Sequence, residues 1–464
     1  DAWKLCAGSP DVIVAVLDGP VQYTHTDLAA SMWVNEAELN GVEGVDDDGN
    51  KYVDDIYGYN FNTAGYSNGA ISWTTEGESG HGTHVAGVIA AVNNNGIGIS
   101  SIAGGSGNGD GVRLMSIQIF ENEEGCYSHQ IAQAYHYAAD NGAVLINNSW
   151  GFEPGVYVSD ADFEANDSVL KAAIDYFEEN AGLEGVMDGG LSIYAAGNEQ
   201  YPESIYPGAY HKYTCVTSMA SDYTAAYYTN YGPGCNIAAP GGDAYYGTIY
   251  CISSTSPDLS YGYEYMQGTS MATPHVTGCA ALAISYALER GYTLTTEELR
   301  NLILTSTHDI NAYQVGTKVS YDYSIGEFFD MALDGYRGKL GSGYIDAHLM
   351  LMQMDGTPCL YLSTGDVAGL SLDAFFGGGS EDLTYLRAEI SDEDKERLGV
   401  TAEPYFENGM LRINCTNRGS ARISVTAIVG GTSLGGGNKM GGMEVTREFE
   451  IVVRRAKAEN GGWL

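Results

Sequence analysis

Basic residues are scarce in this chain, and long apolar runs are missing. Lys and Arg number 21 against 60 Asp and Glu, which gives a formal net charge of −39. A charge of this sign repels phosphate backbones and anionic membrane surfaces, so nucleic acid is excluded as a partner. No run of about 18 apolar residues occurs, so no transmembrane helix is predicted. The chain starts at Asp1 without a signal-like segment, and we expect any targeting or pro-segment to have been removed or left out.

Paired cysteine motifs are also missing. None of the cysteines has CxxC spacing, which argues against a zinc framework. Their even number permits disulfides in an oxidising compartment, whereas several lie in apolar patterns that suit buried free thiols, and both alternatives stay open. The eight cysteines are Cys6, Cys126, Cys215, Cys235, Cys251, Cys279, Cys359 and Cys415.

The remaining composition is that of a packed globular protein, with 44% hydrophobic and 17% charged residues over 464 positions. Short apolar β-branched runs such as Val12 to Asp18 alternate with segments of helical period such as Ser128 to Gly142. A long apolar segment after Ser270 predicts a central helix that ends near Gly291. This alternation predicts an α/β domain with a mostly parallel sheet over residues 1–354.

Helical period disappears beyond residue 354. The segments LYLST, MLRINCT, ARISVTAIV and REFEIVVRR alternate as half-buried strands between Gly and Asn turns. Residues 355–464 are therefore predicted to form a small antiparallel, all-β sandwich, for which we favour a structural role.

Four short segments supply the groups that peptide hydrolysis needs. Without a metal, the reaction requires a nucleophile, a base, a carboxylate that orients the base, and donors for the oxyanion. The segments are AVLDGPVQYTHTDL at Asp18, GHGTHVAG at His81, YAAGNE at Asn198 and GTSMATPHVTG at Ser270. Each lies at a strand end or a helix start, where open α/β folds place their sites.

GHGTHVAG and GTSMATPHVTG resemble the His and Ser motifs of the subtilisin-like proteases, in the Asp, His, Ser order typical of that family. The resemblance extends from Ala2 to about Ala347 and implies a three-layer fold with a mostly parallel sheet. It also implies that Asp18 orients His81, that His81 is the base, and that Ser270 is the nucleophile. Asn198 and the Ser270 backbone would form the oxyanion hole.

Several alternatives stand beside this reading. His84, one turn after His81, competes as the base. The family usually has a hydroxyl residue and then Gly after the aspartate, whereas this chain has Gly19 and Pro20, so a hydrogen bond to the carboxylate can be missing. A non-catalytic peptide-binding or adhesion protein on the same scaffold is the rival function. HGTH is not a zinc motif, because its spacing is i, i+3 and the glutamate of HExxH is absent.

The resemblance extends to substrate binding. SWG (Ser149, Trp150, Gly151) would be the edge strand to which an extended peptide adds, and Ala195, Ala196 and Gly197 would line the facing wall of the specificity pocket. We expect a peptide or protein substrate and a preference for large apolar side chains. The enzyme is expected to be a monomer that is secreted, periplasmic or attached to the cell surface.

The acidic loop GVDDDGNKYVDD has oxygen ligands at alternate positions around Gly49, which predicts a structural calcium site. An acidic surface turn is the alternative. The proposed ligands are Asp46, Asp48, Asn50, Tyr52 and Asp55, with Asp54 beside them. Asp27 and Asn94 match the family's tight calcium site, although an inserted residue alters that loop.

Overall fold

The computed structural model describes most of the chain in seventeen stretches separated by short gaps. They are residues 1–62, 69, 71, 73, 80–121, 124–182, 185–244, 252–257, 262–322, 325–357, 359–365, 369–376, 383–417, 419–430, 432–435, 438–440 and 442–454. The chain divides into two compact units, Ala2–Met350 and a second unit that begins at Leu351.

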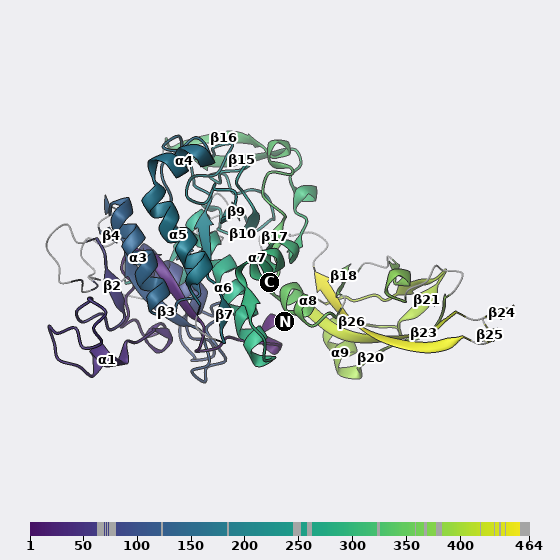
Figure 1. Ribbon diagram of the computed structural model, residues 1–464. Coiled ribbons are helices and arrows are strands. Elements are labelled where there is room, and N and C mark those ends of the chain that lie inside the picture. The colour runs from purple at the N-terminus through teal and green to yellow at the C-terminus, as the bar shows by residue number, and fades with distance from the viewer. Residues whose placement is uncertain are drawn as a thin grey trace. The chain divides into compact units, whose positions relative to one another are not determined.

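A nine-stranded sheet forms the centre of the first unit (Figure 1). Among the described residues its strand pairs are parallel except β14 with β17, so the predicted mostly parallel α/β sheet is confirmed. In spatial order the strands are β14 (Thr307–His308), β17 (Tyr344–Ile345), β10 (Ile237–Pro240), β9 (Thr214–Met219), β8 (Leu191–Ala195), β6 (Leu145–Asn148), β1 (Ile13–Asp18), β3 (Arg113–Gln118) and β2 (Gly58–Asn60).

Helices cover both faces of this sheet, and side-chain alternation along β1 decides which residues meet them. Ala15 and Leu17 pack in one core with α3 (Ser128–Asp140) and α5 (Ser168–Asn180). Successive side chains of a strand point to opposite faces, so Asp18 lies on the other face. Helices α2 (His81–Ala90) and α6 (Thr269–Glu289) pack together there, and α2 contacts β1.

Helix α6 is the buried helix that the apolar segment predicted. Nearly all of its residues from Thr269 to Ala287 are buried, and Thr277 Oγ1 donates to Asn147 Oδ1 of β6 at 2.9 Å. The hydrogen bond from Thr277 to Asn147 and the apolar packing of α6 together fix this helix against the sheet. The other helices of this unit are α1 (Glu36–Leu39), α4 (Asp160–Asn166), α7 (Thr296–Thr305) and α8 (Ala347–Met354), the last ending beyond Met350.

Short strands outside the sheet form hairpins or small pairs. The hairpin β15 (Thr317–Asp322) with β16 (Glu327–Ala332) is antiparallel and pairs Lys318 with Met331. The others are β4 (Phe120–Glu121), β5 (Glu124–Gly125), β7 (Met187–Asp188), β11 (Ile252–Thr255), β12 (Tyr263–Met266) and β13 (Leu294–Thr295).

The second unit contains two main sheets that share one hydrophobic core. The first sheet contains β18 (Cys359–Ser363), β26 (Met443–Arg454), β23 (Gly419–Val429) and β20 (Leu383–Ile390). The second contains β19 (Leu370–Ser371), β22 (Met410–Arg412) and β21 (Tyr405–Glu407), and β24 (Thr432–Gly435) pairs with β25 (Asn438–Met440).

The antiparallel sheets of this unit are consistent with the predicted β-sandwich, and two details depart from the prediction. Helix α9 (Asp392–Leu398) interrupts the strands, so the unit is not all-β. Its end signals are visible in the sequence, because the Ser391 side chain caps the Asp394 N–H and Gly399 ends the helix at φ 63°. The pairing is also not wholly antiparallel, since β18 runs parallel to β26.

Six cysteines in the described part of the chain are free thiols: Cys6, Cys126, Cys215, Cys235, Cys279 and Cys415. Cys251 and the side chain of Cys359 lie outside the described part of the structure. Within the described stretches, no helix combines the length and the apolar character needed to cross a membrane.

Candidate active site

Asp18 and His81 meet where β1 ends and α2 begins. Asp18 is the last residue of β1 and is only 2% exposed, and His81 is the first residue of α2. His81 Nδ1 donates to Asp18 Oδ1 at 2.7 Å. This bond fixes the tautomer and the orientation of the imidazole, leaving Nε2 to act on another group.

The bond requires two backbone segments to approach each other closely. A Cβ at Gly82 would lie 2.2 Å from the Gly19 carbonyl oxygen, so a side chain there would push α2 away from β1. Gly80, at φ 70°, begins the helix in the left-handed region. These glycines allow His81 to reach the buried carboxylate.

The local electrostatics favour protonated His81. Burial disfavours the imidazolium ion, but the charge of Asp18 and its hydrogen bond outweigh that effect and raise the pKa of His81 above its ordinary value of 6.5. A base with a raised pKa accepts a proton more readily. The neutral, base-competent form is correspondingly lost as the pH falls through that raised pKa.

The Asp18 carboxylate is unevenly supported. Its Oδ1 accepts from the Gly19 N–H at 2.7 Å as well as from His81, whereas its buried Oδ2 has no hydrogen-bond partner among the described residues. Gly19 has no hydroxyl to offer, as its departure from the family pattern suggested. The hydrogen bond that holds His81 is nevertheless formed.

His84, the competing candidate, is buried in the interior. Its side chain is 0% exposed, and its Nε2 contacts the Ile252 carbonyl oxygen at 3.1 Å. Burial lowers the pKa of His84 to about 4, so it is neutral at pH 7 and closed to solvent. His84 is therefore a core residue.

Ser270 is the second residue of α6 and is tied to the end of β6. Its hydroxyl donates to the Ser149 carbonyl oxygen at 3.1 Å, and the Ser149 hydroxyl donates to the Ser270 carbonyl oxygen at 2.8 Å. Asn147 Nδ2 in turn donates to Ser149 Oγ at 2.9 Å. The reciprocal bonds place the serine hydroxyl beside the predicted substrate strand.

The Asn198 amide has a defined orientation. Its Oδ1 accepts from the Thr269 N–H at 2.9 Å and from the Thr269 hydroxyl at 3.0 Å. A backbone N–H can only donate, so the amide oxygen must face Thr269 and the amide NH2 points elsewhere. A Cβ at Gly268 would lie 3.7 Å from Asn198 Nδ2 and 3.5 Å from the Ser270 nitrogen. Glycine thus leaves space beside two donors suited to an oxyanion.

Ile205, which the sequence did not indicate, links the two predicted walls of the specificity pocket. Its N–H donates to the Ala196 carbonyl oxygen at 3.2 Å, on the wall Ala195–Gly197. A Cβ at Gly151, on the wall Ser149–Gly151, would lie 2.5 Å from Ile205 Cδ1. The aliphatic side chain therefore packs against Gly151, where no sequence pattern pointed to it.

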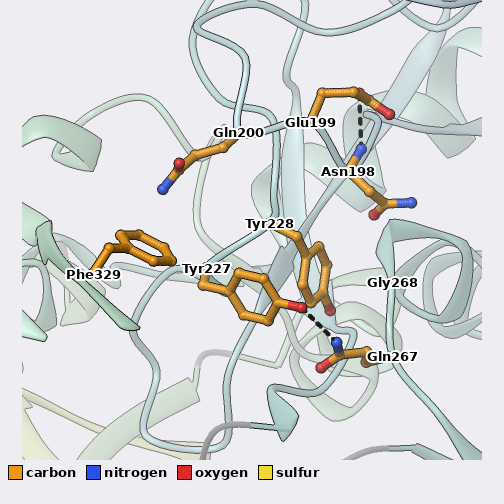
Figure 2. A pocket seen from close by; sticks show the side chains of 8 residues that line it. All are labelled: Asn198, Glu199, Gln200, Tyr227, Tyr228, Gln267, Gly268 and Phe329. Atoms are coloured by element: carbon orange, nitrogen blue, oxygen red, sulfur yellow. Dashed lines mark hydrogen bonds between the residues drawn. The ribbon is translucent and has the colours of Figure 1, made fainter. Parts of the chain in front are cut away.

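A cavity of about 340 Å³ adjoins Asn198 and Gly268 on the first unit (Figure 2). It shares none of the residues of the two predicted walls. The described residues that line it are Asn198, Glu199, Gln200, Tyr227, Tyr228, Gln267, Gly268 and Phe329. Three aromatic rings thus line the same cavity as Asn198 and Gly268.

The acidic loop gathers some of its predicted calcium ligands and adds one. Carboxylate oxygens of Asp46 and Asp48 lie within 4.8 Å of a carboxylate oxygen of Glu38 and of each other. Glu38 is buried in the short helix α1, and its position before the DDDGN segment hid it from the sequence pattern. Three hard oxygen donors at this separation suit a calcium ion.

Other predicted ligands in this loop have structural partners. Asn50 Nδ2 donates to both Asp48 Oδ2 and Asp55 Oδ2 at 3.0 Å. The buried Asp55 also accepts from the Tyr137 hydroxyl at 2.7 Å, and burial raises the pKa of Asp55. The Tyr52 N–H donates to Asn50 Oδ1 at 2.7 Å, and its ring packs against Tyr137. These residues hold the loop in place.

Asp27 and Asn94, the second set of predicted calcium ligands, have separate hydrogen-bond partners in the structure. Asn95 Nδ2 donates to the fully buried Asp27 Oδ1 at 2.5 Å, whereas Asn94 Nδ2 donates to the Ser106 carbonyl oxygen at 3.1 Å. Asn94 adopts φ 56° in this loop. The Ile99 N–H and the Tyr263 hydroxyl complete the Asp27 environment.

The chain matches a known family over most of its first unit. Residues 9–327 match the family model described as Peptidase_S8, Subtilase family. Halolysin from Haloferax mediterranei is 31% identical over 309 residues, covering 67% of this chain and 47% of that protein. The halolysin-like extracellular serine protease of Natrialba magadii is 30% identical over 309 residues, covering 67% of this chain and 46% of that protein. The chain thus spans about half the length of these relatives.

Solved structures share the fold of this chain. A protease from Pseudoalteromonas arctica matches with a TM-score of 0.53 and 24% identity, over 76% of this chain and 92% of that one. A lanthipeptide protease matches with a TM-score of 0.53 and 22% identity, over 76% of this chain and 90% of that one. At these identities the likeness shows the fold alone.

We expect the Asp18→Asn substitution to lower the pKa of His81 below its ordinary value of 6.5. The substitution removes the charge that raises this pKa, while burial continues to lower it. The pKa can be followed by NMR titration of the His81 ring, assigned with a His81→Gln variant. As a control, Asp346→Asn removes the carboxylate bonded to His308 Nε2 at 2.7 Å and should leave His81 unchanged. Equal His81 pKa values in the wild type and Asp18→Asn would contradict the assignment.

Proposed function

This chain belongs to the subtilase family, and from that premise we propose that it is a serine endopeptidase acting through an acyl-enzyme. The supporting observations are the 2.7 Å bond from His81 to Asp18 and, at the start of α6, Ser270 next to an Asn198 amide of fixed orientation. Asp18 orients His81, His81 is the general base, and Ser270 is the nucleophile. The likeness to serine proteases supports the same chemistry.

In the proposed reaction the Ser270 hydroxyl turns from the Ser149 carbonyl oxygen to His81 Nε2. His81 takes its proton as Oγ attacks the peptide carbonyl carbon, and the oxyanion binds Asn198 Nδ2 and the Ser270 N–H. Collapse of this intermediate breaks the C–N bond, and His81 gives its proton to the leaving amine. Water then attacks the acyl-enzyme by the same route and restores Ser270.

The peptide bound before the scissile bond adds to the strand Ser149–Gly151 by main-chain hydrogen bonds. Ile205 packs against Gly151 and bonds Ala196, so it occupies space that a large side chain of the substrate would need. The proposed preference on this side is therefore for a small residue, in place of the large apolar residue expected from the sequence.

The proposed site of action is outside the cell. The relative from Natrialba magadii is named an extracellular protease. The net charge of −39 also suits a protein that must stay soluble outside a cell.

A structural calcium ion at Glu38, Asp46 and Asp48 is a second proposal. Desolvation favours the protonated form of Asp46, but backbone N–H groups of Lys51, Gly49 and Asn50 lower its pKa and keep it charged. Each carboxylate oxygen has two lone pairs, so an oxygen that accepts one N–H can still bind a metal ion. Calcium here would relieve repulsion among the three carboxylates and stabilise the loop.

The Ser270→Ala variant should lose peptidase activity by several orders of magnitude while its melting temperature stays near the wild-type value. A fluorophosphonate should label wild-type Ser270 covalently and leave the variant unlabelled, as mass spectrometry of the labelled peptide would report. Unchanged casein hydrolysis by the Ser270→Ala variant would show that Ser270 is not the nucleophile. Peptide binding without any adduct at neutral pH would favour the non-catalytic peptide-binding or adhesion protein.

Ile205→Ala should increase kcat/KM for peptides with a large residue before the scissile bond. Removal of buried methyl groups opens space, and each added substrate methylene in such a pocket is worth about 10-fold or more. The measurement compares peptides that have Ala or Phe at that position. Wild type should prefer Ala, and Ile205→Val should lie between wild type and Ile205→Ala. A wild-type preference for Phe would show that Ile205 does not limit the size of the substrate residue that binds there.

Calcium should raise the melting temperature of the wild-type protein, and a chelator should reverse the shift. Saturating a site at about 100 times its Kd stabilises the folded state by about 2.7 kcal/mol. Asp46→Asn should abolish most of this shift, and Asp47→Asn is the matched control because Asp47 lies outside the three-carboxylate group. Equal calcium shifts in both variants would place the ion elsewhere, and no shift in wild type would exclude it.

A further inference from the structure

The cavity beside Asn198 has no role in the proposed chemistry, although it opens next to the reacting atoms. Asn198 and Gly268 form one side of it, and its other lining residues lead away from the walls at Ser149–Gly151 and Ala195–Gly197. A peptide that binds along Ser149–Gly151 and passes Ser270 must continue beyond the oxyanion donors. The cavity therefore lies where the part of the substrate after the scissile bond can reach it.

Rigid aromatic rings form the far side of this cavity. Tyr228 is almost fully buried, and its hydroxyl contacts the Gly241 and Gly242 carbonyl oxygens at 2.9 and 2.7 Å. The Tyr227 ring lies edge to face with Tyr228, with centroids 5.1 Å apart and an interplanar angle of 83°. Phe329 lies 6.4 Å from Tyr227 at 67° and completes the row. Figure 2 shows the three rings side by side across the cavity.

Two polar side chains at the cavity, Gln267 and Glu199, are hydrogen-bonded within the protein. Gln267 Nε2 donates to the Tyr227 hydroxyl at 3.0 Å, and Gln267 Oε1 accepts from the Ala244 N–H at 2.7 Å. Glu199 Oε2 accepts from the Asn198 N–H at 2.9 Å and from Asn230 Nδ2 at 2.8 Å. Gln267 and Glu199 thus hold the walls of the cavity in place, and the three rings offer it faces and edges, which favours an aromatic ligand.

The hairpin β15–β16 holds Phe329 in the cavity. Lys318 Nζ is buried against Asp243 Oδ2 at 2.7 Å and also donates to the Ala225 carbonyl oxygen at 3.1 Å. The hairpin register pairs Lys318 with Met331 and Ser320 with Phe329, so these side chains share the inward face. Phe328 falls on the opposite face and is 69% exposed. The buried ion pair thus sets which of the two adjacent phenylalanines reaches the site.

We infer that this cavity binds an aromatic side chain of the substrate that follows the scissile bond, and that Phe329 of the β15–β16 hairpin determines this preference. The inference rests on the proposed endopeptidase function. A volume of about 340 Å³ lies near the lower end of the range for ligand pockets, about 300–1,000 Å³, and suits one large side chain. Edge-to-face contacts with the three rings would orient it.

The test is digestion of a mixed peptide library by the full chain, with the new N-termini of the products sequenced by mass spectrometry. Aromatic residues should be enriched at the first or second position after the cleaved bond. Two matched peptides that differ only there, Phe against Ala, then give a kcat/KM ratio. Phe329→Ala should lower this ratio by about 10-fold or more, because the aromatic contact is lost only for Phe.

Phe328→Ala is the matched control, since it removes the same side chain from the outward face of the same strand. It should keep the wild-type ratio, and both variants should keep the wild-type preference before the scissile bond. Fluorophosphonate labelling without aromatic enrichment, or equal ratios in wild type and Phe329→Ala, would overturn this inference and leave the peptidase intact. A protein that neither labels nor cleaves would overturn the proposed function and this inference with it.

Discussion

The hydrogen bond between His81 and Asp18 depends on how closely the start of α2 approaches the end of β1. Only a residue without a side chain fits at Gly82, where a Cβ would meet the Gly19 carbonyl oxygen at 2.2 Å. The approach is maintained because β1 lies inside the sheet and α2 packs on the face that Asp18 shares. Buried, close-packed elements such as these move little, so the imidazole is held before any substrate binds.

The parallel sheet brings the remaining groups to the same edge. Asp18 ends β1, and Ser149 and Asn198 follow the ends of β6 and β8; the three strands are neighbours in the sheet. Parallel strands share the direction of their carboxyl ends, so these residues converge although they are far apart in sequence. The Ser149 hydroxyl donates to the Ser270 carbonyl oxygen, and the Thr269 N–H donates to Asn198 Oδ1, so the start of α6 is bound to that edge. The start of one helix thereby lies against both Ser149 and Asn198.

Local patterns failed where partners were distant or a loop was irregular. Glu38 joins the acidic group from a separate helix, which the spacing within DDDGN could not show. Asn95, which the sequence pattern did not indicate, donates to Asp27. Ile205 and Phe329 reach the site from segments with no motif, because only chain packing brings them to Gly151 and Tyr227. Helix α9 shows the opposite case, since its cap signals were present but the surrounding strand pattern hid them.

Periodicity and motif chemistry therefore determined the α/β class, the central apolar helix and the residue types of the candidate site. Strand alternation and helix starts are local properties, so sequence suffices to predict them. Tertiary structure decided which histidine, His81 or His84, faces solvent beside the carboxylate, and which of Phe328 and Phe329 faces the cavity. These choices depend on packing and register across distant segments, whose distances a linear sequence does not contain.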